Sequence, residues 1–147
     1  MLTRYRDGIV PAPGPSHVGE RFAGLGERVA GQLRGLDFRG ALEGTWELVS
    51  ALNRAIDERK PWELHKEGRT GELDAVLYDL CEGLRRLAVM LHPFMPERMS
   101  ALWEQLGSPG RIDADWSSSL QTWDGLPPLT QTAMAAPLFP KVELAPS

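Results

Sequence analysis

Hydrophobic residues recur every three or four positions along most of the chain, which is the spacing of one face of an α-helix. The pattern predicts helices over about 17–34, 38–59, 71–91 and 97–106, and therefore an all-α helix bundle. The third of these has the widest apolar face. Arg85 and Arg86 fall on its opposite side, where charged residues usually face solvent.

Residues that favour helix ends agree with these boundaries. Ser16, Asp37 and Thr70 have side chains that cap helix N-termini, and each stands just before a predicted helix. Pro96 is suited to the first position of the last helix, and Gly107 to the stop after it.

The remaining segments organise the chain as one domain, 1–147. Residues 1–15 are predicted to be the last turn of a first helix followed by a proline-rich extended connector, and 16–107 form the bundle. Residues 108–147 have no helical pattern but contain Trp116 and Trp123, and such large apolar rings are seldom left in water. We therefore expect this tail to pack back on the helices, with an extended segment at 137–144.

Composition limits the function classes. The net charge of −4 and pI of about 5.4 argue against coating nucleic acid by bulk charge, although a local basic face is compatible with them. No apolar run approaches the roughly 20 residues of a membrane span. Cys81 is the only cysteine, so no disulfide framework or cysteine zinc cluster is expected, and a cytoplasmic location is predicted.

Catalytic and metal-binding motifs are absent from the sequence. It has no phosphate-binding glycine loop and no nucleophile elbow, and His17, His65 and His92 are too far apart to form a site by spacing. We predict no catalytic residues and no metal ligands. A small helical enzyme that uses His65 or His92 stays an open alternative.

The Pro61-Trp62 pair is the strongest candidate for a binding site. Proline lacks an N–H and has a preset φ, so it suits the first helical position and holds Trp62 on the first turn. A rigid ring among cations is suited to stacking on an unpaired base. The alternative is that Trp62 only fills the gap between two helices.

Cations near this turn are the candidate phosphate contacts: Arg54, Arg59, Lys60, Lys66 and Arg69. Asn53 lies beside the apolar stripe of the helix that precedes the turn. Because a polar amide at a helix contact needs hydrogen-bond partners, we expect Asn53 to tie that helix to the backbone of the Pro61 turn.

Several motifs, read in order, resemble the C-terminal anticodon-binding domain of methionyl-tRNA synthetases, which are class I aminoacyl-tRNA synthetases. They are Asn53 before Pro61-Trp62-x-Leu64-x-Lys66, then Leu77-Tyr78, His92-Pro93-Phe94-Met95-Pro96, Trp103-x-x-Leu106-Gly107 and Pro137-Leu138-Phe139-Pro140-Lys141-Val142. The opening RYRDGIVPAP is similar to a connector of the same family. The resemblance covers nearly the whole chain and gives Pro61, Pro93 and Pro96 structural roles.

The resemblance implies a noncatalytic helix bundle that binds the CAU anticodon loop of methionine tRNA. In this family the tryptophan of the Pro-Trp turn stacks on the first anticodon base, a cytosine, and that role carries over to Trp62. The family's asparagine and arginine that read the cytosine lie on a first helix, of which residues 1–6 match only the last turn. Arg4 and Arg6 do not match those positions and receive no role.

The ATP-binding motifs of the class I catalytic domain are absent, so the resemblance implies no cofactor and no methionine activation by this chain alone. The implied partners are methionine tRNA and a catalytic domain, in cis or in trans, and the chain is expected to be a fragment or a separate subunit. The alternative function is a helical interaction module that docks a partner chain through the groove left by the missing first helix.

Overall fold

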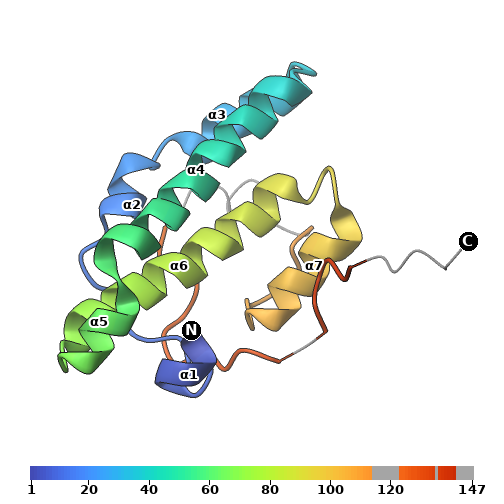
Figure 1. The fold of residues 1–147 in the computed structure, drawn as a ribbon. Helices are drawn as coiled ribbons and strands as arrows, with labels where there is room; N and C mark the ends of the chain where they lie inside the picture. The colour runs from blue at the N-terminus through green and yellow to red at the C-terminus, as the bar shows by residue number, and fades with distance from the viewer. Residues whose placement is uncertain (114–122, 135, 142–147) are drawn as a thin grey trace, which may run out of the picture.

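The computed structural model describes residues 1–113, 123–134 and 136–141. The α-helices in these ranges are α1 (Leu2–Arg6), α2 (His17–Arg21), α3 (Leu25–Arg34), α4 (Phe38–Arg59), α5 (Pro61–Lys66), α6 (Thr70–Leu91) and α7 (Pro96–Gln105). Figure 1 shows the long helices α4 and α6 side by side, with α3 along α4 and α7 beside the end of α6. The predicted all-α class is confirmed. None of these helices is long and apolar enough to cross a membrane.

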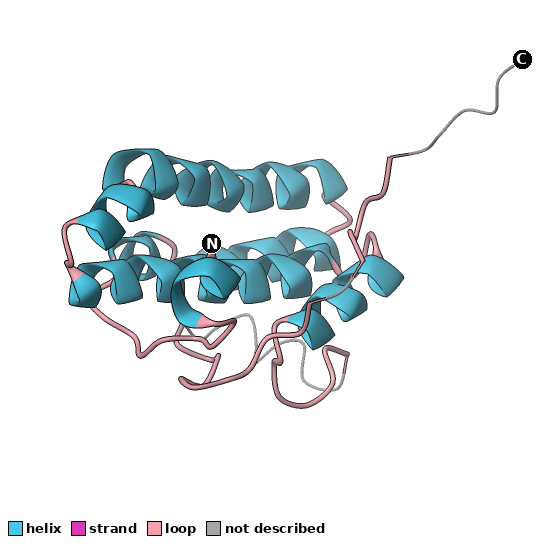
Figure 2. Cartoon of the chain, turned by 60° about the horizontal axis from the view of Figure 1, so that its bottom comes forward, coloured by secondary structure: helices cyan, strands magenta, loops and turns pink. Residues whose placement is uncertain are grey.

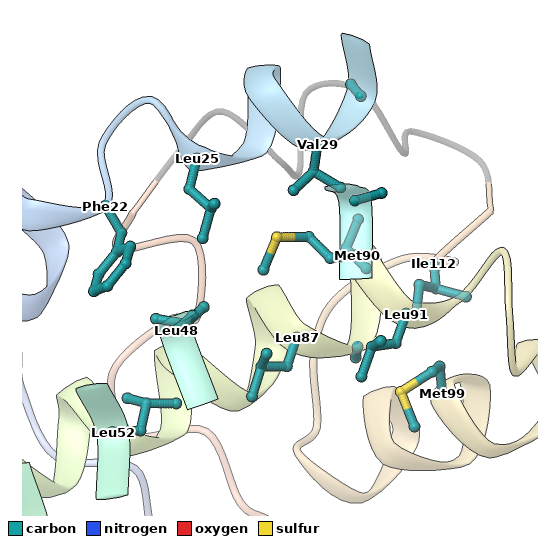
Figure 3. Close-up of a cluster of buried hydrophobic side chains, with 14 of the residues drawn as sticks. Phe22, Leu25, Val29, Leu48, Leu52, Leu87, Met90, Leu91, Met99 and Ile112 are labelled. Carbon is teal, nitrogen blue, oxygen red and sulfur yellow. The ribbon is translucent and has the colours of Figure 1, made fainter. Parts of the chain in front are cut away.

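The main hydrophobic core lies where α3, α4 and α6 meet. Leu25 and Val29 of α3 point toward Met90 of α6, with Leu48 of α4 between the layers (Figure 3). The helices approach closely at Gly83, where an added Cβ would lie 2.5 Å from the Leu52 side chain. The rest of the core contains Phe22, Leu87, Leu91, Met99, Trp103 and Ile112. Most of the core residues that lie in helices follow the three-to-four spacing of the sequence. The predicted face of α4 is partly wrong, because Phe38, at the start of its apolar stripe, is 52% exposed.

The predicted single helix over 17–34 is wrong in one respect, because it breaks into α2 and α3 between Phe22 and Gly24. Ser16 caps α2 as expected, since its hydroxyl accepts a hydrogen bond from the Gly19 N–H at 2.8 Å. The break turns Phe22 into the core, where its side chain is 6% exposed. Gly24 lies in this interruption, and glycine is a poor helix former.

Three further residues were predicted to mark the starts of helices. Asp37 caps α4, because its carboxylate accepts a hydrogen bond from the Gly40 N–H at 2.9 Å. Thr70 is not a cap: it is the first residue of α6, and Arg69 occupies the cap position without a side-chain bond. Pro96 occupies the first turn of α7 as predicted. The Pro93 turn between α6 and α7 is closed by hydrogen bonds from the Phe94 and Met95 N–H groups to the Leu91 carbonyl.

The tail packs back on the bundle in its described part, as expected. The Trp123 ring packs against the main core, and an added Cβ on Gly19 would lie 2.8 Å from it. Residues 129–132 also run antiparallel to the connector: the Val10 N–H donates to the Thr130 carbonyl and the Thr132 N–H to the Gly8 carbonyl, each at 2.9 Å. Figure 2 shows these loop segments gathered along one side of the helices. Trp116 and residues 142–144 lie outside the described residues.

Arg85 and Arg86 do not face solvent, which corrects the sequence prediction. They are 2% and 0% exposed, because the tail covers this side of α6. The buried Glu82 carboxylate accepts hydrogen bonds from the Arg85 guanidinium and from the Gly125 and Leu126 N–H groups. A buried charge is tolerable only when paired and hydrogen-bonded, and the Glu82–Arg85 pair meets that requirement with groups from α6 and the tail.

Candidate nucleic-acid interface

The turn between α4 and α5 has an unusual backbone conformation. Lys60 ends α4 with φ 45° and ψ 70°, in the left-handed region, and its N–H donates to the Ile56 carbonyl at 3.0 Å. Pro61 follows as the first residue of α5, where its missing N–H leaves no donor unpaired. The Lys60 carbonyl then accepts hydrogen bonds from the Glu63 and Leu64 N–H groups. The turn is therefore closed by its own backbone.

Trp62 is presented outward on the first turn of α5. Its side chain is 42% exposed, whereas Pro61 is buried and Leu64 is 5% exposed. Leu64 packs with Leu73, Val76 and Leu77 of α6, which fixes the helix that carries the indole. The short helix α5 thus holds a large aromatic ring at the surface, while its buried residues Pro61 and Leu64 fix the helix on the bundle.

The candidate phosphate contacts fall into two groups. Lys60 pairs with Glu63 at 3.1 Å, and Arg69 is held by both Glu67 and Glu72. Arg54, Arg59 and Lys66 are exposed, and none of them has an ion pair within the described ranges. These ion pairs lie at the surface, so they compete only weakly with a phosphate. Lys60 must leave one carboxylate to bind a phosphate, whereas Arg69 must leave two.

Asn53 lies exposed on α4, away from the buried stripe. No hydrogen bond joins its side chain to the Pro61 turn in the part of the chain that the structure describes. The predicted tie does not form, because the hydrogen bonds of the Lys60 N–H and carbonyl already close that turn. Asn53 is therefore open to solvent on the same helix that leads to Trp62.

Sequence reasoning missed a contact between two aromatic rings beside α5. The rings of Tyr5 and His65 lie 4.7 Å apart between centroids, and the Arg4 guanidinium is 5.8 Å from the Tyr5 centroid. The Arg6 guanidinium donates to the Asp74 carboxylate, which joins α1 to α6. Nothing in the spacing of residues 5 and 65 indicates this pairing, because it depends on how α1 docks.

Trp46 is a second residue that the sequence reading passed over. It is 53% exposed on α4, as large an exposed ring as Trp62. A signal was available: the predicted buried stripe of this helix runs through residues 45 and 49, and position 46 lies off it. An aromatic residue on the polar face of a predicted helix indicates an exposed ring, and Trp46 could have been identified in this way.

The described residues were also searched for side chains that could hold a metal ion. They contain no group of three or more histidine, cysteine, aspartate or glutamate side chains that could hold a metal ion. Cys81 is buried in α6. The candidate site at the α4–α5 junction therefore consists of the exposed Trp62 ring and the cations around it.

Comparison with known proteins agrees with this geometry. Residues 19–137 match the family described as the anticodon-binding domain of tRNA ligase. The chain is 32% identical to the methionine–tRNA ligase of Halalkalibacterium halodurans over 98% of its own length and 23% of that protein. It is 36% identical to the enzyme of Caldanaerobacter subterraneus subsp. tengcongensis over 86% of its length and 19% of that protein.

The fold comparison gives the same result. The structure of apo methionyl-tRNA synthetase from Mycobacterium tuberculosis superposes with a TM-score of 0.83 and 27% identity, over 99% of this chain and 30% of that one. The chain thus spans about a fifth to a third of the proteins it matches. It belongs to the family of anticodon-binding domains of tRNA ligases and is homologous to the corresponding region of methionyl-tRNA synthetases.

Proposed function

We propose that this chain recognises the anticodon of methionine tRNA, with Trp62 stacking on the first anticodon base, as the noncatalytic part of a methionyl-tRNA synthetase. The observation that carries the proposal is the position of Trp62: a half-exposed indole on a short helix that Pro61 and Leu64 anchor. Proteins read unpaired RNA bases by stacking them on aromatic rings and hydrogen-bonding their edges.

The surroundings of Trp62 support the same role. Arg59, Lys60 and Lys66 flank it on both sides of the turn, and all three are exposed. Cations at such positions contact the phosphates that follow a stacked base. Arg59 and Lys66, which hold no carboxylate in the described ranges, are the first candidates for these contacts.

In this proposal ATP and methionine bind to the catalytic domain of the synthetase, in the same polypeptide or in a partner. This chain contributes affinity for the anticodon end of the tRNA. Contacts of the catalytic domain with the acceptor arm add to that affinity, because the two binding sites are linked. The chain alone should therefore bind tRNA weakly, and an acidic net charge of −4 is compatible with that. Charging of tRNA for translation also implies the cytoplasm.

The test is a titration of the chain with the anticodon stem-loop of methionine tRNA, beside a stem-loop whose first anticodon cytosine is changed to adenine. The chain is expected to prefer the cytosine hairpin. Trp62→Ala should weaken binding of that hairpin by about 1–3 kcal/mol, which is the value of one stacked base. Trp62→Phe, which keeps an aromatic face, should recover part of the loss.

Phe38→Ala is the matched control, because Phe38 is also an exposed ring, 52% exposed, at the opposite end of α4. A helix of that length is roughly 30 Å long, so the control removes an aromatic ring far from Trp62. Equal losses for Trp62→Ala and Phe38→Ala, or equal affinity of the parent chain for both hairpins, would contradict the proposal.

A further inference from the structure

The short helix α1 docks beside the helix that carries Trp62. A small apolar cluster joins α5 to α6 and consists of Leu64, Leu73, Val76 and Leu77. The side chains of Leu2 and Tyr5, both on α1 and both half-buried, pack against this cluster. The first helix of the described chain therefore supports the same apolar contact that fixes α5 on the bundle.

Tyr5 also contacts α5 through its ring. The ring centroids of Tyr5 and His65 lie 4.7 Å apart, and the ring planes are tilted by 37°. Aromatic pairs at this distance attract each other beyond what their buried area explains. His65 follows Trp62 by three positions in α5, and residues with this spacing are neighbours on a helix surface. The Tyr5 ring thus lies against the residue next to Trp62.

Polar contacts fix Tyr5 itself in place. The Arg6 guanidinium donates to the Asp74 carboxylate of α6, and also to the Tyr5 carbonyl at 2.7 Å. The side chains of this ion pair are only 23% and 28% exposed, so water and salt screen it less than a fully exposed pair. One guanidinium therefore joins α6 to the backbone of the residue that meets α5.

The helix α5 needs such support because it is short and interrupted at both ends. It has six residues, and a helix of this length is not stable in water on its own. Lys60 before it has φ 45°, and Gly68 after it has φ +69°, so α5 continues neither α4 nor α6. Its orientation therefore depends on the side chains that pack against it.

We propose that Tyr5 is a positioning residue for Trp62: its contacts with His65 and with the Leu64 cluster hold α5 in the orientation that presents the indole to the first anticodon base. The inference rests on the proposed function and deepens it, because it names a residue on another helix that acts on base recognition through Trp62. If α5 is docked for only part of the time, the apparent affinity for RNA falls by that fraction.

The first test measures binding of the cytosine hairpin by the full chain. Tyr5→Ala should weaken it by about 2- to 12-fold, which is the value of one aromatic contact. Tyr5→Phe keeps the ring and should bind like the parent. In a Trp62→Ala background, Tyr5→Ala should change the affinity by less than about 2-fold, because no indole is left to position. This comparison separates action through Trp62 from a direct contact between Tyr5 and RNA.

The second test needs no RNA. The N–H groups of Glu63 and Leu64 donate to the Lys60 carbonyl, so their hydrogen exchange reports the opening of α5. In Tyr5→Ala these two amides should exchange about 2- to 12-fold faster, because the docked state has lost one aromatic contact. The amides of α3 should exchange as in the parent, and Tyr5→Phe should leave both groups unchanged.

Phe94→Ala is the matched control. Phe94 is also half-buried, and its ring centroid lies 6.2 Å from that of Phe38. It follows the C-terminal end of α6, whereas α5 is joined to the N-terminal end, where the Arg69 N–H donates to the Leu64 carbonyl at 3.0 Å. Since α6 is roughly 30 Å long, the control loses a ring contact far from α5 and should change neither hairpin affinity nor α5 exchange.

The outcomes separate the two proposals. Unchanged hairpin affinity in Tyr5→Ala, or an equal loss with and without Trp62, would overturn the positioning role and keep the anticodon role. Faster exchange confined to α5 in Tyr5→Ala, with no cytosine preference in the parent, would keep the docking role of Tyr5 and overturn the anticodon role. Exchange that accelerates equally in α3 and α5 would show that Tyr5 supports the whole bundle, and would also overturn the positioning role.

Discussion

The carboxylate of Glu82, in the middle of α6, accepts a hydrogen bond from the backbone N–H of Leu126, 44 residues further along the chain, at 3.0 Å. The same carboxylate pairs with Arg85, and the Tyr78 hydroxyl donates to the Leu126 carbonyl at 2.9 Å. One buried acidic side chain thus attaches the tail to α6.

Replacing Glu82 should therefore be costly. Glu82→Gln keeps the shape but leaves the Arg85 guanidinium buried beside a neutral amide, and breaking a buried pair from one side costs about 3–5 kcal/mol. Urea unfolding followed by circular dichroism measures the loss. Glu43→Gln, which removes an exposed pair with Arg39, should cost less than about 1 kcal/mol. Similar losses in the two variants would show that the buried pair is not the attachment.

Gly107 should tolerate substitution less well than other glycines with the same backbone conformation. Its φ is +69°, and an added Cβ would lie 2.7 Å from the Gln131 carbonyl oxygen. Gly68 has the same φ of +69° with nothing within 4 Å, so Gly68→Ala measures the backbone strain alone, about 1–2 kcal/mol. Gly107→Ala should lower the free energy of unfolding by more, because the tail must also move. Equal losses would indicate that the tail shifts at no cost.

Cys81 makes stability depend on alkaline pH. Burial raises the pKa of its thiol from the usual 9.0 to about 11, and the charge of Glu82 adds to the shift. Since the folded chain holds this proton more tightly than the unfolded chain, the contribution to stability is complete below pH 9. It falls as the pH rises toward 11, by about 2–3 kcal/mol in total.

The measurement compares urea unfolding of the parent chain and Cys81→Ala at pH 8 and at several values up to pH 11. The difference between the two proteins isolates the thiol from other groups, such as Tyr78, whose pKa is also raised by burial. A difference that stays constant with pH would contradict the prediction.

Lys66 and Arg69 should differ as phosphate contacts, although the sequence places both near Trp62. Lys66 is exposed at the end of α5 and has no ion pair in the described ranges, whereas Arg69 is shared between two glutamates. Lys66→Gln is expected to lower the salt slope of hairpin binding by about 1, and Arg69→Gln to change it little. The reverse order would show that RNA displaces the glutamates from Arg69.

The helices could be predicted from sequence because their signals are local. The apolar spacing, the caps at Ser16 and Asp37, and the proline starts at Pro61 and Pro96 all act within a few residues. The outward position of Trp62 follows from the same local signals. What could not be predicted depends on packing between distant segments.

Arg85 and Arg86 show this limit most clearly. In the sequence of the helix they indicate a polar, solvent-exposed face. They are buried only because the tail covers that face. The docking of Tyr5 against His65 is invisible in the sequence for the same reason. The exposed position of Trp46, by contrast, had a signal, because position 46 lies off the apolar stripe of α4.

The pairing of the connector with the tail has a consequence for folding during synthesis. The Gly8 carbonyl accepts a hydrogen bond from the Thr132 hydroxyl, 124 residues away, so the ribosome must release the chain through residue 132 before residues 8–10 find their partners. The α3–α4 contacts are local and can form much earlier. The nascent chain should therefore form the α4–α5 junction while Glu82 and Arg86 are still exposed to water, and the tail should bury these two side chains only later.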